Sequence, residues 1–307
     1  MRNVRTPFAF LLLASAVETP IYAALDFTTL QGADGVQLSV VQTGNRQGPA
    51  ILFIHGFSQS YLCWEKQLSD PRLKMRFHLI ALDLRGHGAS GKPSDAAAYG
   101  GEAWAGDIAA VIAATSERRP LVVAWSMGGS VLSSYIKRNG ISHISGINLI
   151  GSSFVWTSVQ FGPRDPYYRA RVTMFEQMQS NDILVNMTGT RAFVSMLTAK
   201  PLAAQEADIL LTYNMLTPAY VRRIIVAKSS AQHDFDDVTP QVTVPVLITF
   251  GTDDKLAPYQ NAINTKRALP AARLSAYQGI GHAPFLEAPE RFNRELEEFA
   301  VAASVRQ

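Results

Sequence analysis

The sequence predicts an α/β fold in which a mostly parallel sheet is covered by helices on both faces. Two observations carry this prediction: short apolar runs typical of buried strands recur along the chain, and helical patterns lie between them. The composition agrees with a globular domain, because 47% of the 307 residues are hydrophobic and 17% are charged. These proportions exclude an intrinsically disordered chain.

The first expected strand, residues 36–43, has partly alternating polarity. The later strands are nearly continuous apolar runs, which is the pattern of strands buried on both faces of a sheet. They are the segments 49–54, 77–83, 121–125, 144–150 and 244–250, with a weaker one at 272–277.

Helical patterns occupy several of the intervals between these strands. Apolar residues recur at three- and four-residue spacing within 104–115, and again within 131–136, directly after Ser126. A last helix is expected around 292–299, with Pro289 near its start. Strands that alternate with helices in this way favour a parallel sheet.

The stretch from about 153 to 240 interrupts the alternation. It contains no clean buried-strand run, and we expect a helical insertion within one domain spanning 24–307 rather than a second independent domain. Its apolar residues could simply pack against the sheet, or a few of them could line a ligand pocket. The insertion is rich in methionine and aromatic residues: Phe154, Trp156, Phe161, Tyr167, Tyr168, Met174, Phe175, Met178, Met187, Phe193 and Met196.

The amino terminus has the order of a secretory signal. Arg2 and Arg5 precede an uncharged, largely apolar run over 8–17, and small residues follow at Ala23 and Ala24. We therefore expect residues 1–23 to be a signal peptide and the protein to be exported, either to the periplasm or outside the cell. The alternative is an amphipathic first helix of the mature domain.

Charge and cysteine content exclude several other classes of protein. The net charge is only +3, from 28 basic and 25 acidic residues, which does not suggest a nucleic-acid partner. A single cysteine, Cys63, excludes an intramolecular disulfide framework and a multi-cysteine zinc site. No run reaches the roughly 18 apolar residues that a membrane-spanning helix needs.

Ser126 occupies the position of a nucleophile elbow, because it follows an apolar strand and precedes a helix. Small residues are needed two positions before and after such a serine, where the turn brings the backbone together. Gly128 meets this requirement, and Ala124 replaces the usual first glycine with one additional methyl group. The alternative is an ordinary turn with a serine that caps the helix.

An oxyanion site is expected after the strand at 49–54. Acyl-transfer chemistry needs backbone donors directed at the developing negative charge, and the amides of Phe57 and Met127 are the expected pair. His55 lies just before Phe57, and we expect it to fix the loop rather than to act as the catalytic base.

His282 is the best-placed of the six histidines to take a proton from Ser126, because it follows the last strand and precedes the last helix. A carboxylate after the strand at 244–250 would orient this imidazole, and both Asp253 and Asp254 lie there. The order along the chain is then Ser, Asp, His, as in the α/β arrangement of this triad.

With these motifs in place, the sequence resembles the α/β-hydrolase family over roughly residues 27–303. The resemblance implies an eight-stranded sheet with a helical lid between strands six and seven. The family pattern places the acid three residues after a glycine and four before a proline, so Gly251 and Pro258 select Asp254. The motifs that carry the resemblance are His55-Gly56-Phe57, the segment 83–90, the Ser126 turn, Asp254 and Gly281-His282.

Within the family, the 83–90 segment and the Ser126 turn are most similar to small esterases and cofactor-free haloperoxidases, whereas the members with an aspartate nucleophile are excluded by Ser126. No arginine cluster suggests an anionic substrate. We therefore expect a serine hydrolase that cleaves an uncharged, apolar ester, thioester or lactone without a metal or cofactor. The alternatives are acyl transfer to peroxide and a ligand-binding protein that has retained the triad. The sequence does not indicate an oligomeric state.

Overall fold

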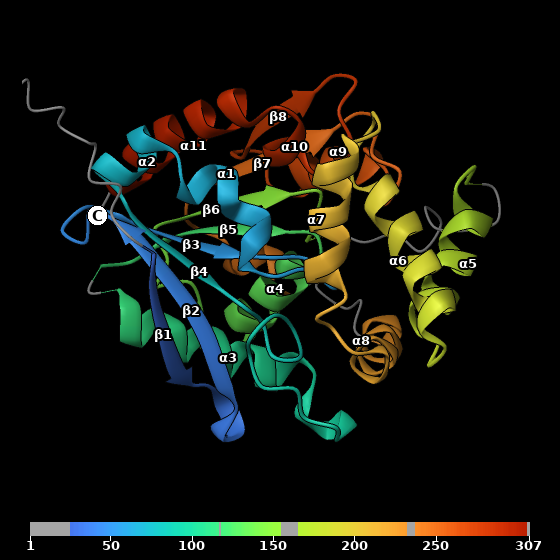
Figure 1. Cartoon of the computed structure of the whole chain (residues 1–307). Helices are drawn as coiled ribbons and strands as arrows, with labels where there is room; N and C mark the ends of the chain where they lie inside the picture. Colours follow the sequence, from blue (N-terminus) through green and yellow to red (C-terminus); the bar gives the residue numbers. More distant parts are fainter. Residues whose placement is uncertain (1–24, 117, 155–164, 232–236, 306–307) are drawn as a thin grey trace, which may run out of the picture.

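The computed structural model describes residues 25–116, 118–154, 165–231 and 237–305. The predicted signal peptide over 1–23 lies outside the described residues, as do Trp156 and Phe161 of the insertion. The described chain forms one eight-stranded sheet in the order β1-β2-β4-β3-β5-β6-β7-β8. Figure 1 shows this sheet crossing the molecule between two layers of helices. The predicted α/β fold and its mostly parallel sheet are confirmed.

The strands β3 to β8 are parallel to one another, whereas β1 and β2 form an antiparallel edge: β1 pairs with β2, and β2 pairs with β4, both antiparallel. Their bounds are β1 Asp26–Gln31, β2 Gln37–Gly44, β3 Ala50–Ile54, β4 His78–Leu82, β5 Leu121–Trp125, β6 Gly146–Ile150, β7 Val246–Gly251 and β8 Arg273–Tyr277. Six of the eight begin or end within two residues of the apolar runs from which they were predicted, and β2 matches the alternating segment.

The first strand, β1, was not predicted from the sequence. It lies at the edge of the sheet and pairs only with β2, so most of its residues are exposed or half-exposed. Phe27, for example, is 59% exposed. An edge strand buries too little surface to need an apolar run, and its sequence signal is correspondingly weak.

Helices cover both faces of the sheet (Figure 1). The helices α3, α4 and α9 pack on one face, and α1, α2, α10 and α11 pack on the other. Their bounds are α1 Glu65–Leu68, α2 Pro71–Arg76, α3 Gly101–Thr115, α4 Met127–Asn139, α9 Gln260–Ala268, α10 Pro284–Glu287 and α11 Pro289–Ser304.

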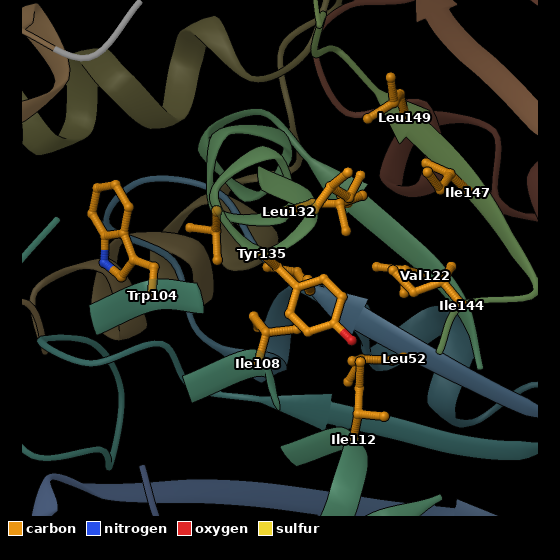
Figure 2. Close-up of a cluster of buried hydrophobic side chains, with 14 of the residues drawn as sticks. Leu52, Trp104, Ile108, Ile112, Val122, Leu132, Tyr135, Ile144, Ile147 and Leu149 are labelled. Atoms are coloured by element: carbon orange, nitrogen blue, oxygen red, sulfur yellow. The ribbon is translucent and has the colours of Figure 1, made fainter. Parts of the chain in front are cut away.

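Alternate residues of the central strands enter opposite cores. In β3, Leu52 and Ile54 join the core beneath α3 and α4, while Ile51 and Phe53 join the core on the other face. Figure 2 shows the first of these cores, in which Tyr135 of α4 lies beside Ile108 of α3 and Leu52 of β3. Each large apolar side chain buried in this way stabilises the fold by about 1.5–3 kcal/mol.

Among the described residues, four α-helices lie between β6 and β7, in the stretch predicted to be a helical insertion. They group together at one side of the sheet in Figure 1. We call them the cap: α5 Tyr168–Met178, α6 Ile183–Met196, α7 Ala204–Asn214 and α8 Ala219–Ala231. Several of the aromatic and methionine residues of the cap pack inward, among them Met174, Met178 and Phe193. Within the described residues, no helix has the length and apolar character needed to cross a membrane.

Candidate active site

Ser126 forms a strained turn between β5 and α4. Its φ of 53° and ψ of −120° place a non-glycine residue in a region that side chains rarely occupy. Its N–H donates to Ile150 O of the neighbouring strand at 2.9 Å, which fixes the turn at the end of the sheet. Because the turn is this sharp, the Ser126 side chain stands at the carboxyl ends of the strands.

The small residues around the serine are required by close backbone approaches. A Cβ atom at Gly128 would lie 2.5 Å from Ile54 O, and one at Gly56 would lie 3.1 Å from the Ser126 Cβ. Ala124 pairs with Ile54 across the sheet and is fully buried in the core, so its additional methyl group is accommodated.

Asp254 and His282 are joined by a hydrogen bond. The distance from His282 Nδ1 to Asp254 Oδ2 is 2.7 Å, and the two side chains are 3% and 0% exposed. The other carboxylate oxygen of Asp254 accepts the N–H groups of Leu256 and Ala257, each at 2.8 Å. Since an ionised carboxylate can only accept, Nδ1 carries the proton and Nε2 is left as the free acceptor.

The neighbouring Asp253 is exposed and turned away from His282. Its carboxylate accepts the hydroxyl of Thr252 at 2.9 Å, which is a local bond within the turn. Adjacent residues on this loop therefore point in different directions, and only Asp254 contacts the imidazole.

His282 lies over the strand end that anchors Ser126. A Cβ atom at Gly151, the residue after Ile150, would lie 2.8 Å from His282 Nδ1, so only a glycine leaves room for the ring. The indole of Trp125 donates to His282 O at 2.9 Å and ties the histidine loop to the residue before Ser126. No hydrogen bond joins Ser126 Oγ to His282 within the described part of the chain; such bonds often tighten only when substrate is bound.

The loop after β3 presents the predicted oxyanion donors. Among the described residues, neither Phe57 N–H nor Met127 N–H has a hydrogen-bond acceptor within the protein. Ser58, which follows Phe57, adopts a φ of 60° and gives the loop its sharp turn. Met127 opens α4, whose amino terminus adds a partial positive charge at the same place.

Two buried histidines hold this loop in place. His55 Nε2 accepts the N–H of Leu84 at 3.0 Å, and His87 Nε2 accepts the N–H of Ser58 at 3.1 Å. Burial lowers the pKa of His55 and lowers the pKa of His87 well below its usual value, so both rings stay neutral. These contacts are those of structural histidines, as expected for His55.

Contacts between the insertion and the loops that carry Asp254 and His282 were not predicted from the sequence. Lys255, next to Asp254, donates to Thr198 O and Ala199 O at 3.0 Å each. Glu287 accepts Gly281 N–H at 2.6 Å and Ala199 N–H at 3.0 Å. The segment after α6 is therefore bonded both to the loop that carries Asp254 and to the loop that carries His282. These bonds join residues that are far apart in the sequence, and no local motif indicates them.

The segment 83–90 builds a second rigid support. Asp83 accepts the N–H groups of Tyr61 and Ala89, each at 2.7 Å. Arg85 and Asp107 form a fully buried pair with two bonds of 2.6 and 2.7 Å.

Across residues 25–116, 118–154, 165–231 and 237–305, no group of three or more His, Cys, Asp or Glu side chains is arranged to hold a metal ion.

The sheet order, the Ser126 turn and the Asp254–His282 pair define an α/β hydrolase. A family model for the α/β hydrolase fold matches residues 49–289, and the chain belongs to this family.

Among solved structures, a proposed aryl esterase from Burkholderia cenocepacia is 34% identical, with a TM-score of 0.83 over 91% of this chain and 100% of that one. The pimeloyl-[acyl-carrier protein] methyl ester esterase of Vibrio vulnificus is 26% identical over 83% of this chain and 95% of its own length. A non-heme chloroperoxidase from Streptomyces lividans is 24% identical over 88% of this chain and 98% of its own length.

Proposed function

We propose that this protein is a serine esterase that hydrolyses uncharged carboxylic esters, thioesters or lactones through an acyl-enzyme. The observation that carries the proposal is the buried Asp254–His282 hydrogen bond beside the strained Ser126 turn. The esterases among the similar proteins support the same reaction class.

In the first half of the reaction, His282 Nε2 takes the proton of the Ser126 hydroxyl as its oxygen attacks the substrate carbonyl carbon. Asp254 stabilises the imidazolium that forms. The carbonyl oxygen becomes an oxyanion and accepts from Phe57 N–H and Met127 N–H, whose hydrogen-bonding capacity the fold leaves unused. Collapse of this intermediate breaks the ester bond, and His282 returns its proton to the departing alcohol.

The second half repeats these steps with water. His282 removes a proton from the water molecule as its oxygen attacks the acyl carbon of Ser126. The same two amides hold the second oxyanion. As this intermediate collapses, the bond to the Ser126 oxygen breaks and His282 gives its proton to that oxygen. The carboxylic acid is released and the serine hydroxyl is restored, so the cycle needs no redox or metal step.

Three phenylalanines place apolar surface next to the oxyanion turn. The ring of Phe57 lies 5.8 Å from that of Phe175 in α5 and 6.1 Å from that of Phe193 in α6, centroid to centroid. This cluster joins the catalytic core to the cap, and it supports an apolar, uncharged substrate.

The test of the proposal is a screen of the purified mature protein against esters of graded chain length, with lactones and amides included. We expect activated esters to be hydrolysed and amides to be left largely intact. Failure to turn over any activated ester, by a protein that is folded, would reject the esterase assignment.

The cap is expected to set the preference for acyl chain length. Phe175→Ala should lower kcat/KM for medium-chain esters relative to acetate by about 10-fold, because its half-buried ring offers apolar surface that only a longer acyl chain would reach. Phe193→Ala should shift the preference in the same direction but also lower the stability, because Phe193 is 4% exposed and belongs to the buried core. Leu184→Ala is the matched control, since Leu184 is a cap residue that is 72% exposed. The measurement is kcat/KM on p-nitrophenyl esters from acetate to decanoate. Equal losses on every ester would mean that these rings only pack the fold.

Acyl transfer to peroxide is the second candidate function, and the similarity to a non-heme chloroperoxidase is the observation that favours it. The same three side chains would serve, with peroxide attacking the acyl-enzyme in place of water. Measuring the partition of the acyl group between peroxide and water as peroxide concentration rises separates the two activities.

We propose further that residues 1–23 are a signal peptide and that the mature protein is periplasmic or secreted. The basic start, short apolar run and small residues before Leu25 support this. Mass spectrometry of the protein from its native cells should find a chain that begins near Ala24. A control expressed without an export pathway should keep the complete amino terminus. An intact Met1 or Arg2 on a cytoplasmic protein from native cells would contradict the proposal.

A further inference from the structure

A buried arginine lies at the centre of the cap and reaches the oxyanion turn. Arg222 of α8 is fully buried, yet among the described residues no carboxylate pairs with it. Its guanidinium donates instead to neutral oxygens of the three other cap helices, α5, α6 and α7. These acceptors are Met178 O at 3.1 Å, Asn186 Oδ1 at 2.7 Å, Thr190 Oγ1 at 2.9 Å and Asn214 O at 2.7 Å.

Burying this charged guanidinium is unfavourable, because a charge removed from water loses its hydration and here gains only hydrogen bonds to neutral groups in return. Burial accordingly lowers the pKa of Arg222 to about 10. A cap that needed only internal packing could be held by apolar residues at lower cost. The contacts within the cap therefore do not by themselves account for an arginine at this position.

A further hydrogen bond of the Arg222 guanidinium joins the cap to the loop after β3. Its Nε donates to Ser58 Oγ at 3.1 Å, and Ser58 is the residue directly after Phe57. The Ser58 hydroxyl in turn donates to Asn214 O at 3.3 Å, and Gln59 Nε2 donates to Asn214 Oδ1 at 3.2 Å. Cap residues thus hold two successive residues of the oxyanion loop.

Ser58 is also the residue whose backbone is strained. Its φ of 60° is in the left-handed region, and its N–H is taken by His87 on the side of the sheet. The His87 bond on one side and the Arg222 bond on the other restrain Ser58 and the Phe57–Ser58 peptide. This restraint limits the movement of Phe57, whose own N–H lies one peptide unit earlier, in the Gly56–Phe57 peptide. Oxyanion stabilisation depends on such preorganised donors.

We propose that Arg222 is a positioning residue for the oxyanion-binding turn: through Ser58 it keeps Phe57 N–H directed at the reacting carbonyl, so that catalysis requires the cap to be seated. This inference rests on the proposed esterase function. Arg222 touches no reacting atom. Its loss should therefore weaken binding of the transition state while leaving binding of the ester ground state nearly unchanged.

The experiment compares four variants with the wild-type protein: Arg222→Met, Ser58→Ala, the double variant and Arg223→Met. Arg223 is the matched control, because it is the next residue on α8 but lies at the surface, where it donates to Gln179 O and Asn181 Oδ1. For each protein we would measure kcat and KM on a p-nitrophenyl ester and the Ki of a trifluoromethyl ketone, which adds to the nucleophilic serine as an oxyanion.

For Arg222→Met we expect kcat to fall by about 10- to 100-fold and the trifluoromethyl ketone Ki to rise in parallel, with KM changed less than about threefold; removal of a whole oxyanion donor costs about 10²–10³-fold. Ser58→Ala should give a smaller change of the same kind. Because the arginine acts through the serine, the double variant should be no worse than Arg222→Met alone. Arg223→Met should match the wild-type protein.

Three outcomes would overturn the inference. They are an unchanged kcat and Ki in Arg222→Met, a change confined to KM or thermal stability, and strictly additive losses in the double variant. If Arg222→Met does not fold, Ser58→Ala decides alone, and an unchanged ketone Ki in that variant rejects the inference. A wild-type protein that neither hydrolyses activated esters nor binds the ketone would instead reject the proposed function itself.

Discussion

Replacing Ser126 with alanine should lower kcat on an activated ester by at least about 10³-fold and toward 10⁶-fold, leaving only the residual rate that the oxyanion donors and substrate binding supply. The fold should survive, because the Ser126 side chain makes no hydrogen bond with the described residues and alanine meets the same backbone strain. The measurement is kcat on p-nitrophenyl acetate, together with the melting temperature.

Ser134→Ala is the matched control for this variant. Ser134 lies on the same helix, α4, and among the described residues its hydroxyl bonds only to Ser130 O within the helix, so its removal should leave kcat unchanged. Near-complete activity in Ser126→Ala would show that the proposed mechanism is wrong. Conversely, turnover that disappears with the Ser126 hydroxyl argues strongly against a protein that merely binds its ligand.

The Asp254→Asn variant should lose about 10⁴-fold in kcat, whereas Asp253→Asn should change kcat little. The amide oxygen of the new asparagine can still accept the N–H groups of Leu256 and Ala257, which leaves its NH₂ group facing His282. The imidazole must then present Nδ1 as an acceptor and carry its proton on Nε2. In that tautomer it cannot accept the proton of Ser126.

Asp253→Asn provides the internal comparison, since Asp253 is exposed and its carboxylate accepts the hydroxyl of Thr252 within its turn. Steady-state kcat of both variants, with circular dichroism to verify folding, makes the comparison. A reversed ranking of the two folded variants would move the catalytic acid to Asp253.

The central strands were predicted well from the sequence, because each of them can be recognised from its own few residues. In β3, β5 and β6 every residue is buried, so each five-residue segment is almost entirely apolar, with Asn148 of β6 as the polar exception. The candidate site is local in the same sense, since Ser126, Asp254 and His282 each follow the end of a strand. The edge strand β1 was missed because its residues need no burial.

The contacts between the cap and the loops could not be predicted in this way. The bond from Arg222 to Ser58 joins residues 164 positions apart, and the bond from Ala199 to Glu287 joins residues 88 apart. Neither partner is part of a motif, and an arginine or glutamate in an amphipathic helix is usually a surface residue. Only the packing of α5 to α8 against the sheet brings these groups together.

The segment after α6 has a consequence for engineering by recombination. Leu197 O accepts the N–H of Ala283, beside His282, and the next residues bond to Lys255 and Glu287. Exchanging the whole stretch from α5 to α8 for that of a related enzyme would therefore also replace residues 197–200, whose bonds hold the loops that carry Asp254 and His282, the proposed acid and base. A chimaera designed to change substrate range should take α5, most of α6, α7 and α8 from the donor and keep residues 197–200 from this chain. In a library built with that boundary, active clones should be far more frequent than in one that cuts only at the strand ends.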